Sequence, residues 1–310
     1  MKNRFFLLVL AACLPLCLRA QDGDQDRIQE LVNRGHALYQ QFSFPEAMDC
    51  YEAAFQMDES NEQLASLIVS CLFEQNKFDE ALRYVEKLGL SQNEEMQKWA
   101  ETVKNTIRAY KELGQVTIDP KEMEESVLSD PGAYVALLER FQQGDLTLTK
   151  GEVLKLYFGA PYAEYATDDQ SVWFIEREIK EGNLKDAFSI GKSILLETPF
   201  AMRLLQMICQ LGEELEEDTT VYYNQLTMLY QTLLLTGNGF SPETATAVTC
   251  ITDQEAFLKM IGYTETSLAE TIEGPQGQYI HKVGFITSQG PKIRYFNYDN
   301  LPEVDAEPVG

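Results

Sequence analysis

The sequence predicts a mostly α-helical protein: an N-terminal superhelix of paired helices, then an α+β domain with further helix pairs and a small C-terminal antiparallel sheet. Three observations predict this class. Apolar residues recur at helical spacing over much of the first 236 residues, a pattern of aromatic and small residues returns after 34 positions, and turn-separated strand-like segments follow. The chain has 310 residues, 45% of them hydrophobic, which is enough for two globular domains.

Residues 1–20 have the organisation of an export signal. Lys2 and Arg4 precede an apolar run over 5–18, which is short for a membrane span, and Ala20 is followed by the acidic segment Q-D-G-D-Q-D. We therefore predict cleavage after Ala20 and export to the periplasm or cell envelope of a Gram-negative bacterium.

A lipid anchor is the alternative for this segment. The letters L-A-A-C, which end at Cys13, resemble a lipobox, and lipidation of Cys13 would make the chain an outer-membrane lipoprotein. No later segment is long and apolar enough to cross a bilayer, so we predict no membrane span.

The charge excludes one class of partner. The chain has 49 acidic and 25 basic residues, a net charge of -24, whereas nucleic-acid binding needs clustered Lys and Arg. We expect no nucleic-acid partner and attribute the acidity to solubility.

The first helix pairs are predicted over residues 21–115. The stretch F-P-E-A-M-D-C-Y-E-A-A-F carries one apolar stripe, and its Phe44 and Ala47 return 34 residues later as Phe78 and Ala81. A 34-residue period of two helices resembles the tetratricopeptide repeat, whose signature matches Leu31, Gly35, Tyr39, Phe44, Ala47, Tyr51 and Ala54. The resemblance implies antiparallel helices that approach closely at the small residues.

Local signals place the ends of these helices. Ser43 and Glu46 have the spacing of a capping box, and Pro45 suits a first helical turn. A fifth helix over 94–113 starts in repeat register but lacks a second helix, so we expect it to cap the repeats.

The second domain is predicted over residues 116–300, helical over 116–236 and α/β over 237–300, with a loose tail over 301–310. Thr149 and Glu152 form another capping box. Helices continue after 171, where Gly182, Ala187 and Pro199 again have tetratricopeptide spacing and Asn183 is expected to cap a helix.

The amino-acid composition changes from helix-like to strand-like in the last part of the chain. The segment T-A-T-A-V-T-C-I has the composition of a strand, and a short helix follows over 253–261. Strands are then predicted around 267–273, 279–287 and 292–298, separated by G-P-Q-G and S-Q-G-P turns that suit an antiparallel meander.

Five short segments of this second domain carry a family resemblance. They are G-D-L-T-L-T at 144–149, L-Y-F-G at 156–159, T-P-F at 198–200, T-G-N-G-F-S-P-E-T-A at 236–245 and Y-F-N at 295–297. With them, residues 116–300 resemble a family of exported bacterial proteins catalogued as domain of unknown function number 4919. The resemblance implies export and brings no activity, cofactor or site residue with it.

Candidates for chemistry are few. His36 and His281 have no His, Cys or Asp cluster at ligand spacing, so we predict surface or hydrogen-bonded histidines, with no metal and no cofactor. The segment G-N-G-F-S-P-E-T lacks the Lys and the length of a phosphate loop and is interpreted as a turn. Cys50 and Cys71 are expected on adjacent helices, as packed thiols rather than a disulfide.

The function predicted from this organisation is protein–protein interaction or scaffolding, because stacked helix pairs form a groove that holds a peptide. By repeat position the groove would be lined by Gln29, Val32, His36, Tyr39, Gln63, Ser70, Phe73, Gln97, Lys104 and Arg108.

Three other interpretations stay open. The repeats could merely support the second domain, which would then fill the groove and bury Tyr39 and Phe73. The chain could be an enzyme of unknown class, with a pocket between the helices and the sheet that gathers several of Asp145, Tyr157, Asn238, Glu243 and His281. It could also be a structural subunit of the envelope, which a lipidated Cys13 would favour.

Overall fold

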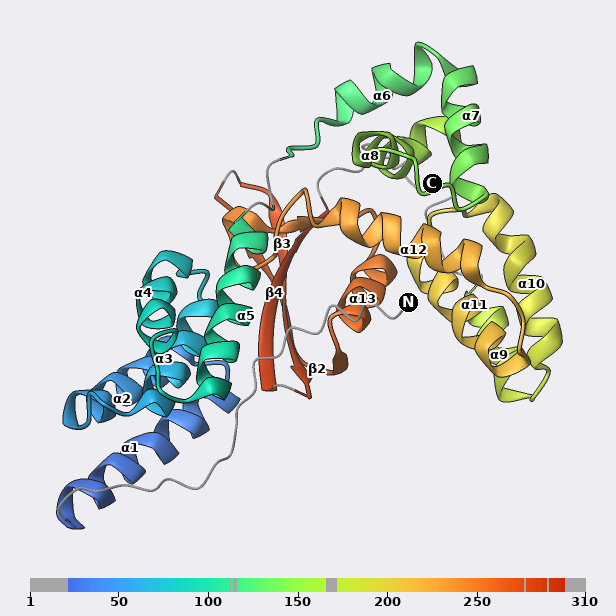
Figure 1. Cartoon of the computed structure of the whole chain (residues 1–310). Coiled ribbons are helices and arrows are strands. Elements are labelled where there is room, and N and C mark those ends of the chain that lie inside the picture. Colours follow the sequence, from blue (N-terminus) through green and yellow to red (C-terminus); the bar gives the residue numbers. More distant parts are fainter. Residues whose placement is uncertain are drawn as a thin grey trace, which may run out of the picture.

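A computed structural model describes residues 22–111, 113, 116–165, 172–275, 277–288 and 290–298. The expected signal sequence, the lipobox and the tail over 301–310 lie outside these residues. In Figure 1 a small sheet stands between two groups of helices, with the N-terminal helices on its left and the remaining helices above it and to its right. The protein is thus mostly α, with an α+β C-terminal part.

Two helix hairpins and a fifth helix form the N-terminal group. Their bounds are α1 Asp22–Gln40, α2 Phe44–Met57, α3 Glu62–Glu74, α4 Phe78–Leu88 and α5 Glu94–Lys111. Their buried side chains form a core that runs between successive helices, as an apolar stripe on each helix requires.

The turns of the two hairpins have the same geometry. Phe42 and Asn76, 34 residues apart, both have a left-handed backbone, with φ of 62° and 59°. Each donates its backbone N–H over 3.1 Å to a carbonyl three residues earlier, of Tyr39 and Phe73 respectively. Ala47 and Ala81 follow at equivalent places, and both side chains are fully buried. The 34-residue sequence period is therefore also a structural period.

The capping box predicted at Ser43 is wrong. Ser43 is the N-cap of α2, but its side chain makes no capping hydrogen bond. The N-caps of α4 and α10, Lys77 and Asn183, also lack one, and all three residues share ψ between 53° and 65°. The tight turn imposes this ψ in place of the extended backbone from which a side chain reaches back to the helix. Where the backbone is extended, at Thr149, the predicted capping box with Glu152 is confirmed.

Close helix approach in the first hairpin depends on Gly35. A Cβ atom added there would lie 2.5 Å from Cε1 of the Tyr51 ring. We expect Gly35→Ala to lower the free energy of unfolding by about 1–3 kcal/mol, because the fully buried ring must move. Gly151→Ala in α8 is the control: nothing lies within 4 Å, so alanine should stabilise by about 0.5–1 kcal/mol. Urea denaturation of both variants measures the two effects, and equal stabilities would contradict the close approach.

The second group of helices begins at Pro120. It comprises α6 Pro120–Leu128, α7 Pro131–Gln142, α8 Lys150–Gly159, a short 3-10 turn Ala160–Ala163, α9 Val172–Lys180, α10 Leu184–Glu197, α11 Met202–Leu215 and α12 Thr220–Leu233. Gly182, with φ of 83°, makes the α9–α10 turn in the same way as Phe42 and Asn76 make theirs. The predicted helical character of this region is confirmed.

The sheet is formed by the C-terminal part of the chain. Its elements are a 3-10 turn Pro242–Thr244, β1 Thr246–Ala247, α13 Ile251–Met260, β2 Tyr263–Glu273, β3 Tyr279–Thr287 and β4 Gly290–Asn297, in the order β1-β4-β3-β2. β2, β3 and β4 form the predicted antiparallel meander, but β1 pairs with β4 in parallel, so the sheet is mixed. β1 has only two residues, which is too short for the alternation of polar and apolar residues that identifies a strand in a sequence.

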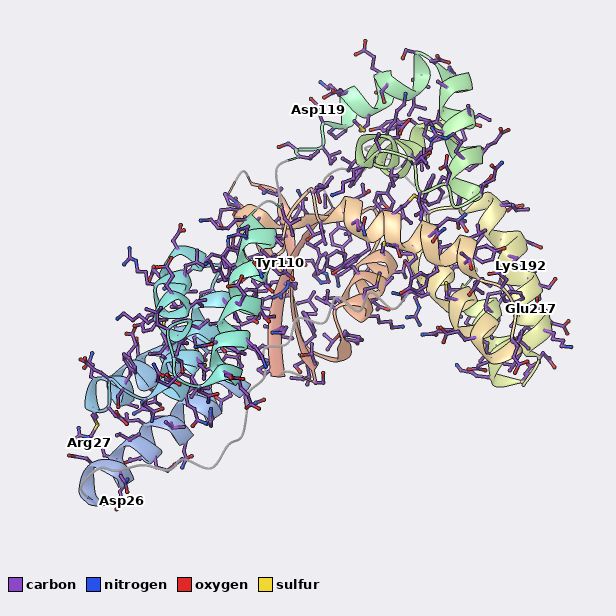
Figure 2. All side chains as sticks on the ribbon, viewed as in Figure 1. Asp26, Arg27, Tyr110, Asp119, Lys192 and Glu217 are labelled. Carbon is purple, nitrogen blue, oxygen red and sulfur yellow. The ribbon has the colours of Figure 1, made fainter. Side chains whose placement is uncertain are left out.

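One face of β4 contacts both groups of helices. Phe296 packs against Phe257 of α13, with ring centroids 5.7 Å apart. Lys292 and Arg294, four and two residues earlier, reach Glu74 of α3. Figure 2 shows side chains occupying the space around the sheet, with Tyr110 at the sheet end of α5. The strand therefore joins the two helical cores.

Candidate functional site

The junction between the N-terminal helices and the sheet contains a buried charge cluster. Glu74, the last residue of α3, accepts a hydrogen bond from Lys292 Nζ at 2.5 Å and from Arg294 Nη1 at 3.3 Å. All three side chains are at least 90% buried. One carboxylate therefore offsets two cations away from water, where an unpaired charge would be costly.

Aromatic rings surround this cluster. Phe240 lies 5.2 Å from Phe73, 5.5 Å from Phe78 and 5.0 Å from Tyr110, measured between ring centroids, in edge-to-face geometry. The Arg294 guanidinium lies 3.8 Å from the centroid of the Phe240 ring, a cation–π contact. The rings exclude water, which strengthens the ion pairs that they enclose.

Opposing effects act on the pKa of Glu74. Burial alone would raise it, but the charges and hydrogen bonds of Lys292 and Arg294 outweigh burial and hold the pKa below its ordinary value of 4.5. Glu74 is therefore ionised at neutral pH, and the cluster is held by charge.

A second buried network lies between α8 and α13. The Tyr157 hydroxyl donates to Asp253 Oδ2 at 2.6 Å and accepts from the Thr249 N–H at 3.0 Å, while Asp253 Oδ1 accepts from the Met202 N–H at 3.0 Å. Burial, and then the charge of Asp253, raise the pKa of Tyr157 well above its ordinary value, so the hydroxyl keeps its proton. The network joins α8, α11 and α13.

His281 belongs to a third, smaller network. Its Nδ1 lies 2.7 Å from Gln254 Oε1, which also accepts from the Tyr298 hydroxyl at 2.6 Å. A carboxamide oxygen only accepts, so Nδ1 carries the proton. Burial lowers the pKa of His281, which keeps the ring neutral near pH 7. The predicted hydrogen-bonded histidine is confirmed here, whereas His36 is exposed, with its ring 5.7 Å from that of Tyr51.

The G-N-G-F-S-P-E-T segment is a turn whose amides bond internally. The Gly239 N–H donates to the Thr244 carbonyl at 2.7 Å, and the Phe240 N–H donates to Asn238 Oδ1 at 3.1 Å. Gly239 has a positive φ, 70°. Gly237 does not; it is needed because a Cβ there would collide with the Ala245 carbonyl oxygen.

The residues expected to line the peptide groove are divided by burial. Phe73 is buried against Phe240, Val32 is buried beside Ile28, Ala54 and Leu64, and the half-buried Tyr39 approaches Gly290 of the sheet. The others keep solvent access: Gln29, His36, Gln97 and Arg108 are exposed, and Gln63, Ser70 and Lys104 are half-buried. Phe73 and Tyr39 lie at the ends of α3 and α1, so the second domain covers the turn end of the expected groove, and the seven positions with solvent access stay open.

The residues required by the enzyme alternative are not brought together. Asp145 accepts from Arg140 and Thr147, Tyr157 bonds Asp253, Asn238 bonds its own turn, and His281 bonds Gln254. Glu243 lies exposed in the 3-10 turn after Asn238. They make separate hydrogen bonds, and none of them lines either of the two best-formed hollows of the described residues.

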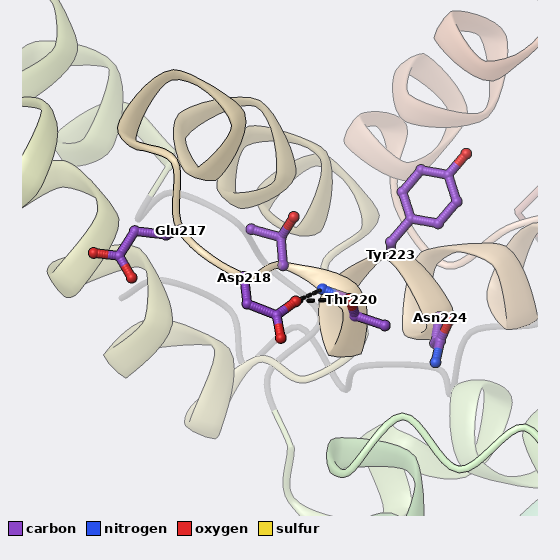
Figure 3. A pocket seen from close by; sticks show the side chains of 6 residues that line it. Glu217, Asp218, Thr220, Tyr223 and Asn224 are labelled. Carbon is purple, nitrogen blue, oxygen red and sulfur yellow. Dashed lines mark hydrogen bonds between the residues drawn. The ribbon is translucent and has the colours of Figure 1, made fainter. Parts of the chain in front are cut away.

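Concave sites elsewhere on the described surface are shallow. One hollow, of about 320 Å³, lies at the start of α12 and is lined by Glu217, Asp218, Thr219, Thr220, Tyr223 and Asn224. Figure 3 shows these side chains. Asp218 is used locally, accepting from the Thr220 N–H at 2.9 Å. Within the described ranges no three His, Cys, Asp or Glu side chains are grouped for a metal ion. Cys50 and Cys71 are both buried free thiols, as expected.

A known protein family matches the second domain. The sequence profile described as "Domain of unknown function (DUF4919)" matches residues 121–275. The chain belongs to this family. No curated protein matches it.

The DUF4919 match includes some of the networks described above and leaves part of the charge cluster outside. It contains α8 with Tyr157, the turn with Asn238 and Phe240, and α13 with Asp253, whereas residues 22–111 and β4 lie outside it. The charge cluster thus joins a residue before the match, Glu74, to two residues after it.

Sequence reasoning did not predict this cluster. Glu74 stands beside Gln75 at a helix end and resembles a solvated residue, and Lys292 and Arg294 alternate with apolar residues as on a half-exposed strand. The one available signal was that Lys292 and Arg294 share a strand face with Phe296, which their spacing of two requires.

Proposed function

We propose that this chain is an exported protein–protein interaction or scaffold module of a Gram-negative cell envelope, and that its N-terminal helices are tetratricopeptide-like hairpins that hold a partner peptide. The observation that carries the proposal is the repeated hairpin geometry at Phe42 and Asn76 together with the equivalent burial of Ala47 and Ala81. Such stacked hairpins form an extended inner face on which peptides bind.

The direction of docking supports a free inner face. The second domain contacts the turn end of the second hairpin: Phe240, in the turn before β1, packs against Phe73 and Phe78, and Lys292 of β4 bonds Glu74. Lys104 and Arg108 lie one helical turn apart on α5 and keep solvent access. In a chain with a net charge of -24, these two cations favour a partner segment that carries carboxylates.

A site-specific cross-linking experiment tests the inner face. A photoreactive phenylalanine analogue placed at Gln97 should label a defined envelope protein, whereas the same analogue at the exposed Glu181, in the α9–α10 turn, should not. The labelled protein is then purified, and its affinity is measured for the double variant Lys104→Glu/Arg108→Glu. We expect binding about tenfold weaker, because two attractive charges become repulsive.

The matched control carries the same charge change elsewhere. Lys180→Glu/Lys185→Glu alters two exposed cations beside the α9–α10 turn and should bind like the unmodified chain. Equal loss in both double variants would show that net charge alone governs binding and would contradict the groove. Mass analysis of the N-terminal peptide from envelope fractions separates cleavage after Ala20 from lipidation at Cys13.

A further inference from the structure

β2 is the outermost strand of the sheet. In the part of the chain that the structure describes, it pairs with β3 on one side and with no strand on the other. In its second half, Ala269, Glu270, Thr271 and Glu273 are exposed, and Leu268 and Ile272 are half-buried. An edge of this kind presents unpaired backbone N–H and C=O groups to solvent.

The hairpin turn identifies which backbone groups face outwards. The Gly274 N–H donates to the Gln278 carbonyl at 2.7 Å, so these two residues form a hydrogen-bonded pair. In an antiparallel ladder, hydrogen-bonded and non-hydrogen-bonded pairs alternate. The pairs Glu273↔Tyr279, Thr271↔His281 and Ala269↔Val283 are then non-hydrogen-bonded. The N–H and C=O groups of Ala269, Thr271 and Glu273 therefore point away from β3, towards the open edge.

The second half of β2 lacks the bulges, prolines and lysines that commonly protect an edge strand from pairing. The register shifts that twist a strand away from pairing are confined to its start, before Leu268. From Leu268 to Glu273 the register with β3 is regular, and the segment contains neither Pro nor Lys. It is an uninterrupted template of six residues.

The charges of β2 select what can pair with it. The strand Y-T-E-T-S-L-A-E-T-I-E has three Glu and no Lys or Arg. Antiparallel pairing of two copies would place six glutamates on one two-stranded ribbon, in a chain whose net charge is already -24. Like charges on facing strands are destabilising, whereas Lys or Arg opposite Glu is favourable. β3 already shows this pairing, with Lys282 Nζ 2.5 Å from Glu270.

We propose that residues 268–273 of β2 accept, by β-strand addition, an extended segment of another protein that carries Lys or Arg at alternate positions. The outward backbone groups of Ala269, Thr271 and Glu273 supply the ladder. The Glu273 carboxylate, in a chain with a net charge of -24, favours a basic strand over an acidic one. This surface is separate from the inner face of α1, α3 and α5, so it stands whether or not the proposed groove binds a peptide.

Three synthetic peptides test the proposal on the purified chain. The probe is acetyl-Thr-Lys-Val-Lys-Val-Lys-Thr-amide, and its control is the same peptide N-methylated on the amides of alternate residues, made in both registers. N-methylation keeps the charge but removes the ladder donors. In titration calorimetry, at least one of the two N-methylated peptides should bind about tenfold more weakly than the unmethylated probe. Equal affinity for all three peptides would mean attraction by charge alone and would overturn strand addition.

Hydrogen exchange locates the bound peptide. The amides of Ala269, Thr271 and Glu273 should exchange about tenfold more slowly with saturating probe, while those of Leu268, Glu270 and Ile272, already bonded to β3, should not change. An unchanged exchange rate at the three outward amides would overturn the proposal.

Variants of the chain complete the test. Glu273→Lys should weaken probe binding about tenfold, whereas Glu197→Lys, the same change at an exposed site on α10, should not. Thr271→Pro removes an outward N–H, so the probe should no longer slow the exchange of the Ala269 and Glu273 amides. The melting temperature of this variant shows whether it folds. If it does not fold, the N-methylated peptides on the unmodified chain decide whether strand addition occurs. Dimerisation of the unmodified chain that Thr271→Pro prevents would overturn the proposal in favour of self-pairing.

Discussion

Replacing Glu74 with glutamine is expected to lower the free energy of unfolding by about 3–5 kcal/mol, because Lys292 and Arg294 then stay buried without a counter-charge. The loss should appear first at the junction, so tryptophan fluorescence, from Trp99 in α5 and Trp173 in α9, and far-ultraviolet circular dichroism should both be followed during urea denaturation. Glu86→Gln removes an exposed carboxylate from α4 and should change stability by no more than about 0.5 kcal/mol. Similar midpoints for the two variants would contradict the buried cluster.

Acid provides a second measurement of the same cluster. The folded-state pKa of Glu74 lies below its ordinary value of 4.5, so its contribution is fully present above about pH 5 and is lost as pH falls through the folded-state pKa. The stability difference between the unmodified chain and Glu74→Gln should therefore be constant from pH 7 to about pH 5 and decrease below it. A difference that grows on acidification would have the wrong sign for a carboxylate stabilised by cations.

Replacing Asp253 with alanine should lower the free energy of unfolding by about 3 kcal/mol, because the Tyr157 hydroxyl and the Met202 N–H lose a charged acceptor in a buried site. Glu255→Ala on the same helix removes an exposed carboxylate 3.7 Å from Arg203 and should cost at most about 1 kcal/mol. Thermal and urea denaturation of both variants give the comparison.

A double-mutant cycle tests whether Tyr157 and Asp253 act together. If they form one network, the cost of Tyr157→Phe should fall by about 1 kcal/mol or more once Asp253 is alanine. Additive costs would show that Asp253 acts through Met202 alone.

The sequence was most informative where a pattern is local. Helical periodicity predicted α1 to α5 and their 34-residue repeat, and alternation placed β3 at 279–287, the bounds that the structure has. Thr149 and Glu152 were predictable as a capping box because Thr149 has the extended backbone that this cap needs. In each case, residues a few positions apart determine the geometry.

The features that sequence missed depend on residues far apart or on backbone angles set by packing. Ser43 has a capping side chain, but the tight turn at Phe42 fixes an unsuitable ψ. The pairing of Glu74 with Lys292 and Arg294 has no local signal, because each residue taken alone resembles a surface charge. For the same reason, the residues expected in the groove could be chosen by repeat position, but not sorted into those covered by the sheet and those left open.

The distance along the chain between Glu74 and Lys292 has a consequence for the order of folding. The two residues are 218 positions apart. During synthesis, α3 is complete long before β4 exists, so its carboxylate stays hydrated until nearly the whole polypeptide has been made. The hairpins can form early, but their final attachment waits for the last strand, and a chain truncated before residue 290 would keep an acidic, aromatic surface exposed to chaperones and proteases.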